Sequence, residues 1–570
     1  MNTVSRSENP GPIPWEPQIM QNEGPTILRF LVRNLLGSRC TVVKLLLLFI
    51  LFPSSAHASN AMPPLSTTIP FLGVLLSIAL APLLIPAFWH KYDNTILIIW
   101  TMMSTWLCFD SIGGNATGHL VSGILFKEYL PFIILIGALY IISSGIHIRI
   151  NKSGTTGVNV AILLVGELLS NLIGTTGTSM LLLRPMLEVN KARKYKVHTV
   201  IFFIFLVSNI GGCLLPFGDP PLFLGYLKGV NFLWTAKHMF PLFLVISTTL
   251  ILVYVVLDKW FLRRECNQAN DGQKEDAGLC NTKNVASSWK MGVEIGGYLD
   301  IALMIVVAVL VAGAGLLSKK EAFSVFGTSV HYKGLFRDVG LILISVVSIV
   351  YRRRTLRRSK HLHEGEGAAH NLSEHSHDAG SGAGEHLHGG AGYCIGEHAH
   401  GDSYEAGHSA GEHLHGHKIS WAPLSEVARY FIAIFITMAP IAVMLKGGHE
   451  FFVPIRNMLG STAHAPFWYF WFVSPFSAFL DNAPTYVVFF KMAGGDALAL
   501  MTEHSRILTA ISAGSVFMGA MTYIGNAPNF MVTSIAKQYG VHMPSFFGYM
   551  AWSCAILLPV MIAVSYFFLY

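Results

Sequence analysis

The chain has 570 residues, of which 52% are hydrophobic and only 12% are charged, and its mean hydropathy is +0.51. A soluble domain carries about 25% charged residues, so this composition excludes an ordinary soluble protein and indicates a membrane protein. The formal net charge of +7 comes from short basic clusters between apolar runs. Such clusters are typical of cytoplasmic loops and argue against nucleic-acid binding.

The chain opens with the features of a secretory leader. Basic residues between positions 29 and 44 precede a short apolar run at 45–52, and Ala-His-Ala follows at 56–58. This order predicts a leader over 1–58 that contains a signal peptide cleaved after Ala58. An uncleaved first helix is the alternative.

Apolar runs of about 20 residues, each long enough to cross roughly 30 Å of hydrocarbon, predict a first transmembrane repeat over 65–260. Its helices are expected near 70–90, 94–110, 129–149, 198–217 and 240–258. The segment 158–185 is broken at its middle by Ile-Gly-Thr-Thr-Gly-Thr. Each arm is then expected to be too short to span, and basic clusters flank both ends. We therefore predict a re-entrant hairpin that enters from the cytoplasmic side.

A predicted cytoplasmic linker over 261–295 leads to a second repeat, which is divided into 296–350 and 425–570. Its helices are expected near 298–316, 338–351, 429–446, 506–524 and 547–569. A second broken segment, 468–491, has Asp-Asn-Ala-Pro at its middle and should re-enter from outside. We predict an all-α polytopic membrane protein with two inverted-topology repeats, each of three helices, a re-entrant hairpin and two further helices, one of them discontinuous. In such proteins paired interruptions point to a binding site at the bilayer midplane.

Four polar breaks stand inside apolar surroundings, at 170–178, 208–221, 481–485 and 525–529. Non-helical backbone at membrane depth is tolerated only where protein buries it or where it lines a cavity. There, carbonyl, amide and hydroxyl oxygens can replace the hydration shell of a small hard cation. Candidate ligands read from the breaks themselves include Ser170, Thr178, Ser208 and Asn529.

Three carboxylates accompany these breaks: Glu167 in the first hairpin arm, Asp219 after the second break, and Asp481 at the second hairpin tip. A charge buried in the membrane costs at least about 2.5 kcal/mol and usually marks an ion or proton path. A carboxylate in a dry site holds a proton that an approaching cation displaces, so one group can exchange the two. The alternatives are a turn role for Asp219 and an ion pair between Glu167 and Arg184.

A hydrophilic, low-complexity stretch over 351–420 predicts a disordered cytoplasmic loop. The unit Gly-Glu-His-x-His-Gly occurs in it three times. Imidazoles at this density bind zinc, nickel or copper weakly in almost any arrangement. The speculative metal ligands are His386, His388, His398, His400, His413 and His415. A spacer without a metal role is the alternative.

The four breaks also carry a family resemblance. The strings are SNLIGTTGTSMLLLRP (170–185), SNIGGCLLPFGDPPL (208–222), FLDNAPTYVVF (479–489) and YIGNAPNFM (523–531). They resemble the ion transporter superfamily, and within it the NhaD-type sodium/proton antiporters and the citrate-transport family close to them, over 65–260 and 425–570. The resemblance implies that hairpin tips and unwound helices hold sodium, that a transport domain moves, and that the protein forms a homodimer. It also implies site roles for Asn171, Thr175, Thr176, Asn209, Asp481, Asn482, Thr485 and Asn526.

Together these observations predict a sodium/proton antiporter of the bacterial cytoplasmic membrane, with Na⁺ as the transported ion, protons and the lipid bilayer as its other partners, and no cofactor. Asp481 with neighbouring Asn and Thr oxygens is the expected exchange site. The closest alternative is sodium-coupled uptake of citrate or a dicarboxylate, in which hairpin amides and Arg184 hold the anion. A divalent-metal transporter or sensor that uses the His-rich loop is less favoured. No nucleophile-and-base arrangement is visible, so we do not expect an enzyme.

Overall fold

The computed structural model describes residues 62–270, 292–315, 317, 321–325, 328–374, 421–460 and 462–570. Eight helices of these ranges are long and apolar enough to cross a membrane. The predicted all-α, multi-pass membrane fold is therefore confirmed. The expected signal peptide and the six histidines predicted as metal ligands lie outside the described residues.

The first repeat begins with a short turn and three spans: η1 (Leu65–Thr68), α3 (Ile69–Leu84), α4 (Pro86–Ile112), and the continuous run of α5 (Gly114–Ile124), η2 (Leu125–Tyr129) and α6 (Leu130–Ser143). It continues, after β1 (His147–Ile150), with the pair α7 (Thr156–Ile173) and α8 (Thr175–Val189). The interrupted helix and the last span follow: α9 (Val197–Leu206), η3 (Ile210–Gly212), α10 (Pro220–Leu227) and α11 (Trp234–Asn270).

The second repeat has the same order of elements. It begins with β2 (Val293–Gly296), α13 (Tyr298–Ala314), β3 (Glu321–Val325), β4 (Thr328–His331), α14 (Tyr332–Glu374), α15 (Ala422–Thr437), α16 (Ala439–Gly447) and α17 (Phe452–Gly460). It ends with the pair α18 (Ala465–Leu480) and α19 (Asn482–Met492), then α20 (Ala497–Met501), α21 (Ser505–Met518), η6 (Gly519–Met521), α22 (Ala527–Gln538) and α23 (Phe546–Leu569).

Both broken segments form helical hairpins. Asn159 near the start of α7 and Asn190 at the end of α8 exchange two side-chain hydrogen bonds of 3.0 and 2.7 Å, so the chain returns to the level at which it entered. In the second hairpin the rings of Phe472 and Phe489 lie 5.9 Å apart across the two arms. One detail of the prediction is wrong: α7 has 18 residues and is long enough to span. The reversal at Gly174, rather than a short arm, makes this segment a hairpin.

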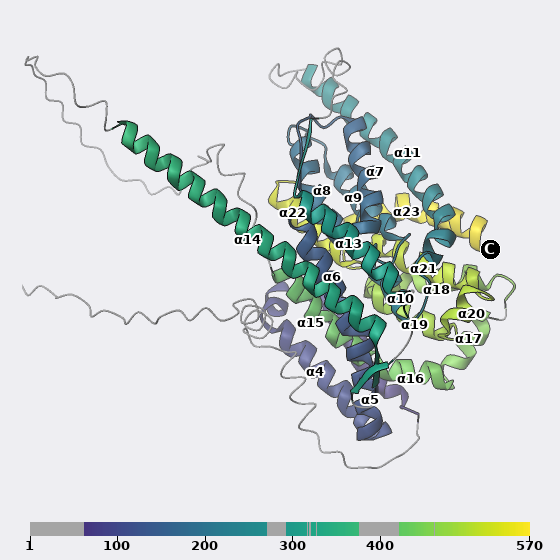
Figure 1. The fold of residues 1–570 in the computed structure, drawn as a ribbon. Helices are drawn as coiled ribbons and strands as arrows, with labels where there is room; N and C mark the ends of the chain where they lie inside the picture. Colours follow the sequence, from purple (N-terminus) through teal and green to yellow (C-terminus); the bar gives the residue numbers. More distant parts are fainter. Residues whose placement is uncertain are drawn as a thin grey trace, which may run out of the picture. The chain divides into compact units, whose positions relative to one another are not determined.

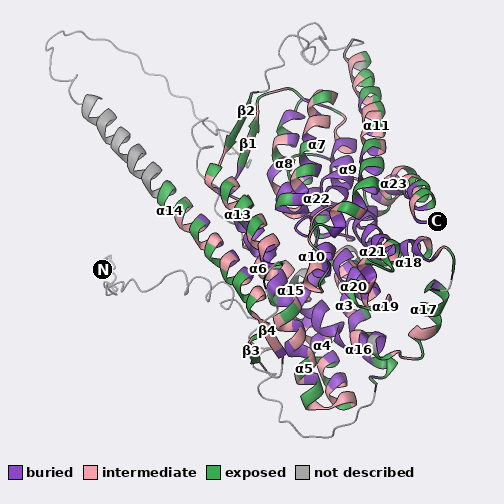
Figure 2. Cartoon of the chain, turned by 45° about the vertical axis from the view of Figure 1, so that its right-hand side comes forward, coloured by how far each residue is buried: buried purple, intermediate pink, exposed green. Residues whose placement is uncertain are grey.

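The two hairpins enter from opposite ends of α11. At the start of α11, the Trp234 indole donates a hydrogen bond to the carbonyl of Met501, just beyond the second hairpin. Toward its other end, Asp258 forms an ion pair of 2.8 Å with Arg193, just beyond the first hairpin. In both views α7 and α8 accordingly lie above α18 and α19 (Figures 1 and 2). This arrangement agrees with the inverted orientation of the repeats.

Several helix ends differ from the sequence prediction. The third span begins at Gly114 rather than near 129, because the π-helical turn η2 joins α5 and α6 without a break. Likewise, α11 continues to Asn270 and α14 to Glu374, beyond the ends expected at 258 and 351. Arg and Lys are good helix formers, so a basic cluster can mark the membrane boundary without ending the helix.

Two small antiparallel ribbons were not predicted. The first pairs His147–Ile150 with Val293–Gly296, and the second pairs β3 with β4. The first ribbon brings the end of α6 to the start of α13, and Arg352 of α14 donates a 2.9 Å hydrogen bond to Ser144 at the same place. The basic clusters in the sequence assign the first ribbon and Arg352 to the cytoplasmic side.

The helices form two groups that pack mainly within themselves. We call residues 156–270 with 465–569, which contain both hairpins and both interrupted helices, the core group. The frame group comprises residues 65–143 with 298–447. Buried residues are concentrated around α9, α21 and α22, whereas α4, α13 and α14 expose much of their surface (Figure 2). Apolar side chains such as Ile305, Val309 and Leu343 are exposed on the outer helices, as expected for contact with lipid.

Candidate functional site

Each hairpin reverses at a single residue with the same unusual backbone. Gly174 has φ +81° and ψ 153°, and Asp481 has φ +81° and ψ 141°. Among the described residues Asp481 is the only non-glycine residue with a positive φ. This region is populated almost only by glycine, and a side chain there costs about 1–3 kcal/mol. Strained residues of this kind cluster at functional sites, which marks the second tip.

The two interrupted helices resume at equivalent residues. Asp219 precedes α10 and Asn526 precedes α22, both with extended backbone, and they are 307 residues apart. Gly174 and Asp481 are separated by the same interval. Gly218 and Gly525, the residues directly before Asp219 and Asn526, must be glycine. A Cβ atom at these positions would lie 2.1 and 2.6 Å, respectively, from a carbonyl oxygen of the preceding turn. The repeat is therefore exact in register at both breaks.

Asp219 lies where the two hairpin tips and the two breaks meet. Its Oδ2 accepts a hydrogen bond of 2.5 Å from the Asn482 amide, at the second tip. Its Oδ1 accepts hydrogen bonds of 3.0 Å from the Asn526 amide and 3.1 Å from the Thr175 hydroxyl. Asp219 is only 1% exposed. One buried carboxylate thus joins both repeats.

A chain of side-chain amides from both interrupted helices extends this network. Asn526 also donates to Asn209 Oδ1 at 3.1 Å, and Asn209 donates to Asn529 Oδ1 at 2.7 Å. Asn529 in turn donates to the carbonyls of Gly519 and Thr522. By contrast, the buried Oδ1 of Asn482 has no hydrogen-bond partner within the described ranges. That oxygen is therefore free to face a bound cation.

Other predicted residues support the breaks rather than Asp219. Ser170 donates a 2.7 Å hydrogen bond to the carbonyl of Val207, and Asn171 Oδ1 accepts one of 2.8 Å from the Leu214 amide. Ser208 shares a 2.8 Å hydrogen bond with Ser179 of α8. These contacts fix the first hairpin against the unwound part of its own repeat.

At the second tip, Asp481 and Thr485 mainly form the start of α19. Asp481 is half-buried, and its Oδ1 accepts a 3.2 Å hydrogen bond from the Ala483 amide. Thr485 donates a 2.7 Å hydrogen bond to the Asp481 carbonyl. Asp481 is thus adjacent to the Asp219 network through its neighbour Asn482.

Two other predicted residues lie in the first hairpin. Thr178 is buried there and Thr176 is half-buried.

Glu167 lies apart from this network. It is buried on α7, and its Oε2 accepts a hydrogen bond from Ser247 of α11. No ion pair joins it to Arg184 in the part of the chain that the structure describes, and Arg184 is exposed. The pairing with Arg184 considered from the sequence is therefore wrong.

Two polar contacts were not found by sequence reasoning. Ser477 donates a 2.5 Å hydrogen bond to the Ser515 carbonyl, which corresponds to the contact of Ser170 with Val207 except that the acceptor lies one residue further along the chain. Comparing the two halves at the 307-residue interval would have identified Ser477. No comparable signal points to Ser247, because α11 reads as an ordinary apolar span.

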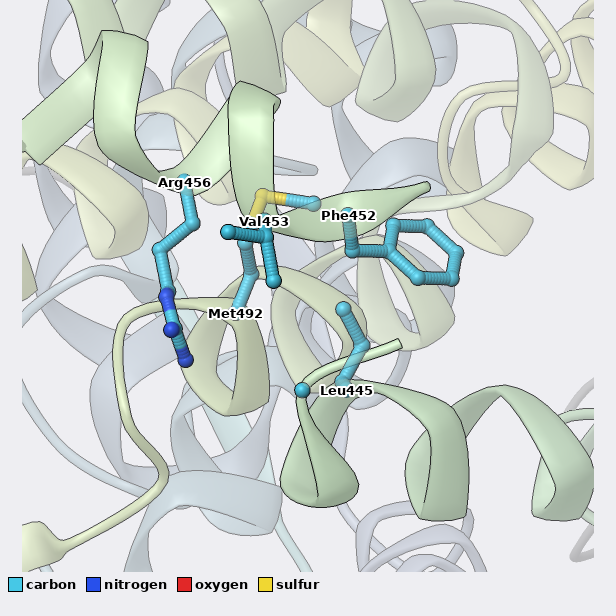
Figure 3. Close-up of a pocket in the computed structure, with 6 residues that line it drawn as sticks. Leu445, Phe452, Val453, Arg456 and Met492 are labelled. Atoms are coloured by element: carbon cyan, nitrogen blue, oxygen red, sulfur yellow. The ribbon is translucent and has the colours of Figure 1, made fainter. Parts of the chain in front are cut away.

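A shallow hollow lies away from the polar network. It is lined by Leu445, Gly448, Phe452, Val453, Arg456 and Met492 (Figure 3). Met492 is the last residue of α19, whereas Asp481 directly precedes the first. The lining of the hollow is largely apolar and contains none of the predicted site residues. The polar network around Asp219 is thus separate from this hollow.

In a multi-pass bundle, two hairpins and two interrupted helices meet at one buried polar site in a manner characteristic of secondary transporters. The chain accordingly falls in that class. It belongs to the family described as "Putative citrate transport", whose model matches residues 60–364 and 406–569. This is a family of transporters rather than enzymes. No curated protein matches the chain.

Proposed function

We propose that the chain exchanges Na⁺ for H⁺ across a bacterial cytoplasmic membrane at the Asp219 site. One observation carries this proposal: the buried Asp219 carboxylate is held by two amides and one hydroxyl, and no Lys, Arg or His side chain contacts it within the described ranges. A buried carboxylate without a fixed cationic partner must be neutralised by a proton or by a bound cation.

The same atoms suit a small hard cation. Sodium and other small hard cations are bound by carboxylate, amide and hydroxyl oxygens. Asp219 and Asp481 supply negative charge, while Asn482 Oδ1 and the Thr175 hydroxyl supply neutral oxygens. A cation that enters this site displaces the proton from the carboxyl group, and reprotonation from the opposite side releases the cation. That sequence of events is exchange of Na⁺ for H⁺.

The second candidate is sodium-coupled uptake of citrate or another carboxylate, which the description of the family favours. In that case the Asp219 site would hold only the coupling ion. The anion would need cationic groups outside the network, and Arg184 on the exposed side of α8 is one such group. Because Asp219 and Asp481 would repel an anion, the geometry supports the cation as cargo.

Everted vesicles that contain the full chain separate the two functions. A pre-formed ΔpH should collapse on addition of Na⁺ without any organic anion, and the Asp219→Asn variant should abolish this effect. Asp496→Asn is the matched control, because Asp496 is exposed and asparagine can keep its cap on α20. Sodium-dependent uptake of labelled citrate, with no Na⁺-induced proton movement, would reject antiport and support the second candidate.

A further inference from the structure

The carboxyl group of Glu167 is buried, and no Lys, Arg or His side chain in the described ranges forms an ion pair with it. Its residue is 2% exposed, one oxygen is bonded to Ser247, and the other, Oε1, has no hydrogen-bond partner in the described part of the chain. An ionised carboxylate with one oxygen unsatisfied in such surroundings is strongly disfavoured. A neutral carboxylic acid needs much less, since its O–H can donate to the serine hydroxyl.

The surroundings of Glu167 suit a proton better than a metal cation. A hard cation needs several oxygen ligands, and within the described ranges Ser247 is the one side chain that hydrogen-bonds to this carboxyl group. The helix arm is also packed tightly here: a Cβ atom on Gly211 would lie 2.7 Å from the Cα of Glu167. The unwound turn therefore packs directly on the backbone of α7 at Glu167.

Glu167 breaks the equivalence of the two repeats. Three residues further along the same arm, Ser170 has its equivalent in Ser477. At the position equivalent to Glu167 the second repeat instead has Ser474, which donates a 2.7 Å hydrogen bond to the carbonyl of its own helix at Phe470. Building the shared site therefore does not require an acid at this place, and the first repeat has one in addition.

The position of Glu167 connects it to the cation site. Its backbone packs directly on the η3 turn that leads to Asp219. The same turn reaches the cation site, because a Cβ atom on Gly212 would lie 2.6 Å from Cγ2 of Thr175 and 2.8 Å from the carbonyl oxygen of Gly218, the residue before Asp219. A rearrangement of the unwound segment on cation binding would therefore change the packing around Glu167.

We propose that Glu167, hydrogen-bonded to Ser247, is a proton-binding site separate from the cation site at Asp219, and that it carries one of the protons moved in each transport cycle. The inference rests on the function proposed above. The step is a simple protonation: an O–H bond forms at the Glu167 carboxylate with a proton from water on one side, and it breaks to release that proton on the other.

The number of protons coupled to each Na⁺ tests this proposal in proteoliposomes that contain the full chain. It is measured as the ΔpH that just balances a set Na⁺ gradient. Glu167→Gln, which keeps the shape and can still bond to Ser247, should transport Na⁺ with one proton fewer per ion. Glu503→Gln makes the same chemical change at an exposed residue and should leave the ratio unchanged. An unchanged ratio in a folded Glu167→Gln protein would overturn the proposal.

A second measurement covers the case in which Glu167→Gln does not fold. Ser247→Ala removes the partner of the acid and should shift the pH midpoint of transport by about 0.5–1 unit, the equivalent of one hydrogen bond, while Ser247→Thr should restore it. Identical pH profiles for all three proteins would overturn the proposal. The proposed Na⁺/H⁺ exchange at Asp219 has its own test, because it is rejected if Asp219→Asn transports Na⁺ normally.

Discussion

The ammonium group of Lys228 lies 2.7 Å from Oε1 of Glu128, and this ion pair joins the core group to the frame group. Lys228 is at the end of α10, the short helix that begins directly after Asp219. Glu128 belongs to the π-helical turn η2 of the third span. By contrast, the pairs Arg193–Asp258 and Arg352–Asp300 each stay within one group. The helix that leads away from the site is thus tied to the frame at its other end.

Breaking this pair should destabilise the described state. In Glu128→Gln or Lys228→Met a largely buried charge loses its partner, and we expect a loss of about 1–3 kcal/mol. This is less than the roughly 3–5 kcal/mol of a fully buried pair, because the side chains are 12% and 17% exposed. Thermal unfolding in detergent measures the effect. The double exchange of Glu128→Lys with Lys228→Glu should recover most of the loss, and a double variant no better than the single ones would contradict an electrostatic role.

Asp481 should show opposite effects on stability and on transport. Glycine at this position removes a backbone strain of about 1–3 kcal/mol and costs only a few tenths of a kcal/mol as a helix cap. We therefore expect Asp481→Gly to unfold at a higher temperature than the parent but to lose most of its Na⁺-dependent transport. Asp481→Asn keeps the cap and the strain, so it serves as the charge-only comparison. A glycine variant with normal transport would show that the carboxylate has no role.

Asn526 should govern affinity at the site. Its amide contacts Asp219, Asn209 and the carbonyl of Ser208. A hydrogen bond to a charged group contributes about 1.5–3 kcal/mol, so Asn526→Ala should raise the KM for the transported cation by about ten- to a hundredfold. Initial rates over a range of Na⁺ concentrations measure this change. Asn457→Ala, at an exposed residue of α17, is the control and should behave as the parent protein.

Asp258 should be important for folding rather than for transport specificity. It is fully buried, and its Oδ1 lies 2.8 Å from both Arg193 Nη1 and His198 Nε2. Removing one partner of a buried pair costs about 3–5 kcal/mol, so Asp258→Asn should lower the unfolding temperature and the yield of folded protein. Any folded fraction should keep the parent KM for Na⁺. A changed KM with unchanged stability would contradict this structural role.

The sequence alone predicted much of the architecture. Apolar runs and basic clusters placed the spans and the hairpins in the right order, because both the length of a span and the cost of an unsatisfied backbone group are local properties. Helix ends were less accurate. The π turn at Leu125–Tyr129 joins two helices without a break and has no clear local signal, whereas the extension of α14 to Glu374 begins in a basic cluster at which the sequence predicts the helix to end.

For the candidate site, the sequence identified the breaks and their polar residues but not how these residues are arranged. Asp481, at the tip of a hairpin, was the most prominent acid in the sequence, whereas the structure places Asp219 at the centre of the contacts from both repeats. The partner of Glu167 was likewise visible only in the fold. The physical reason is that local sequence determines where a helix can form or must break, while the hydrogen-bond partners of a buried carboxylate come from segments up to 307 residues away, and only the packing of the two repeats brings those segments together.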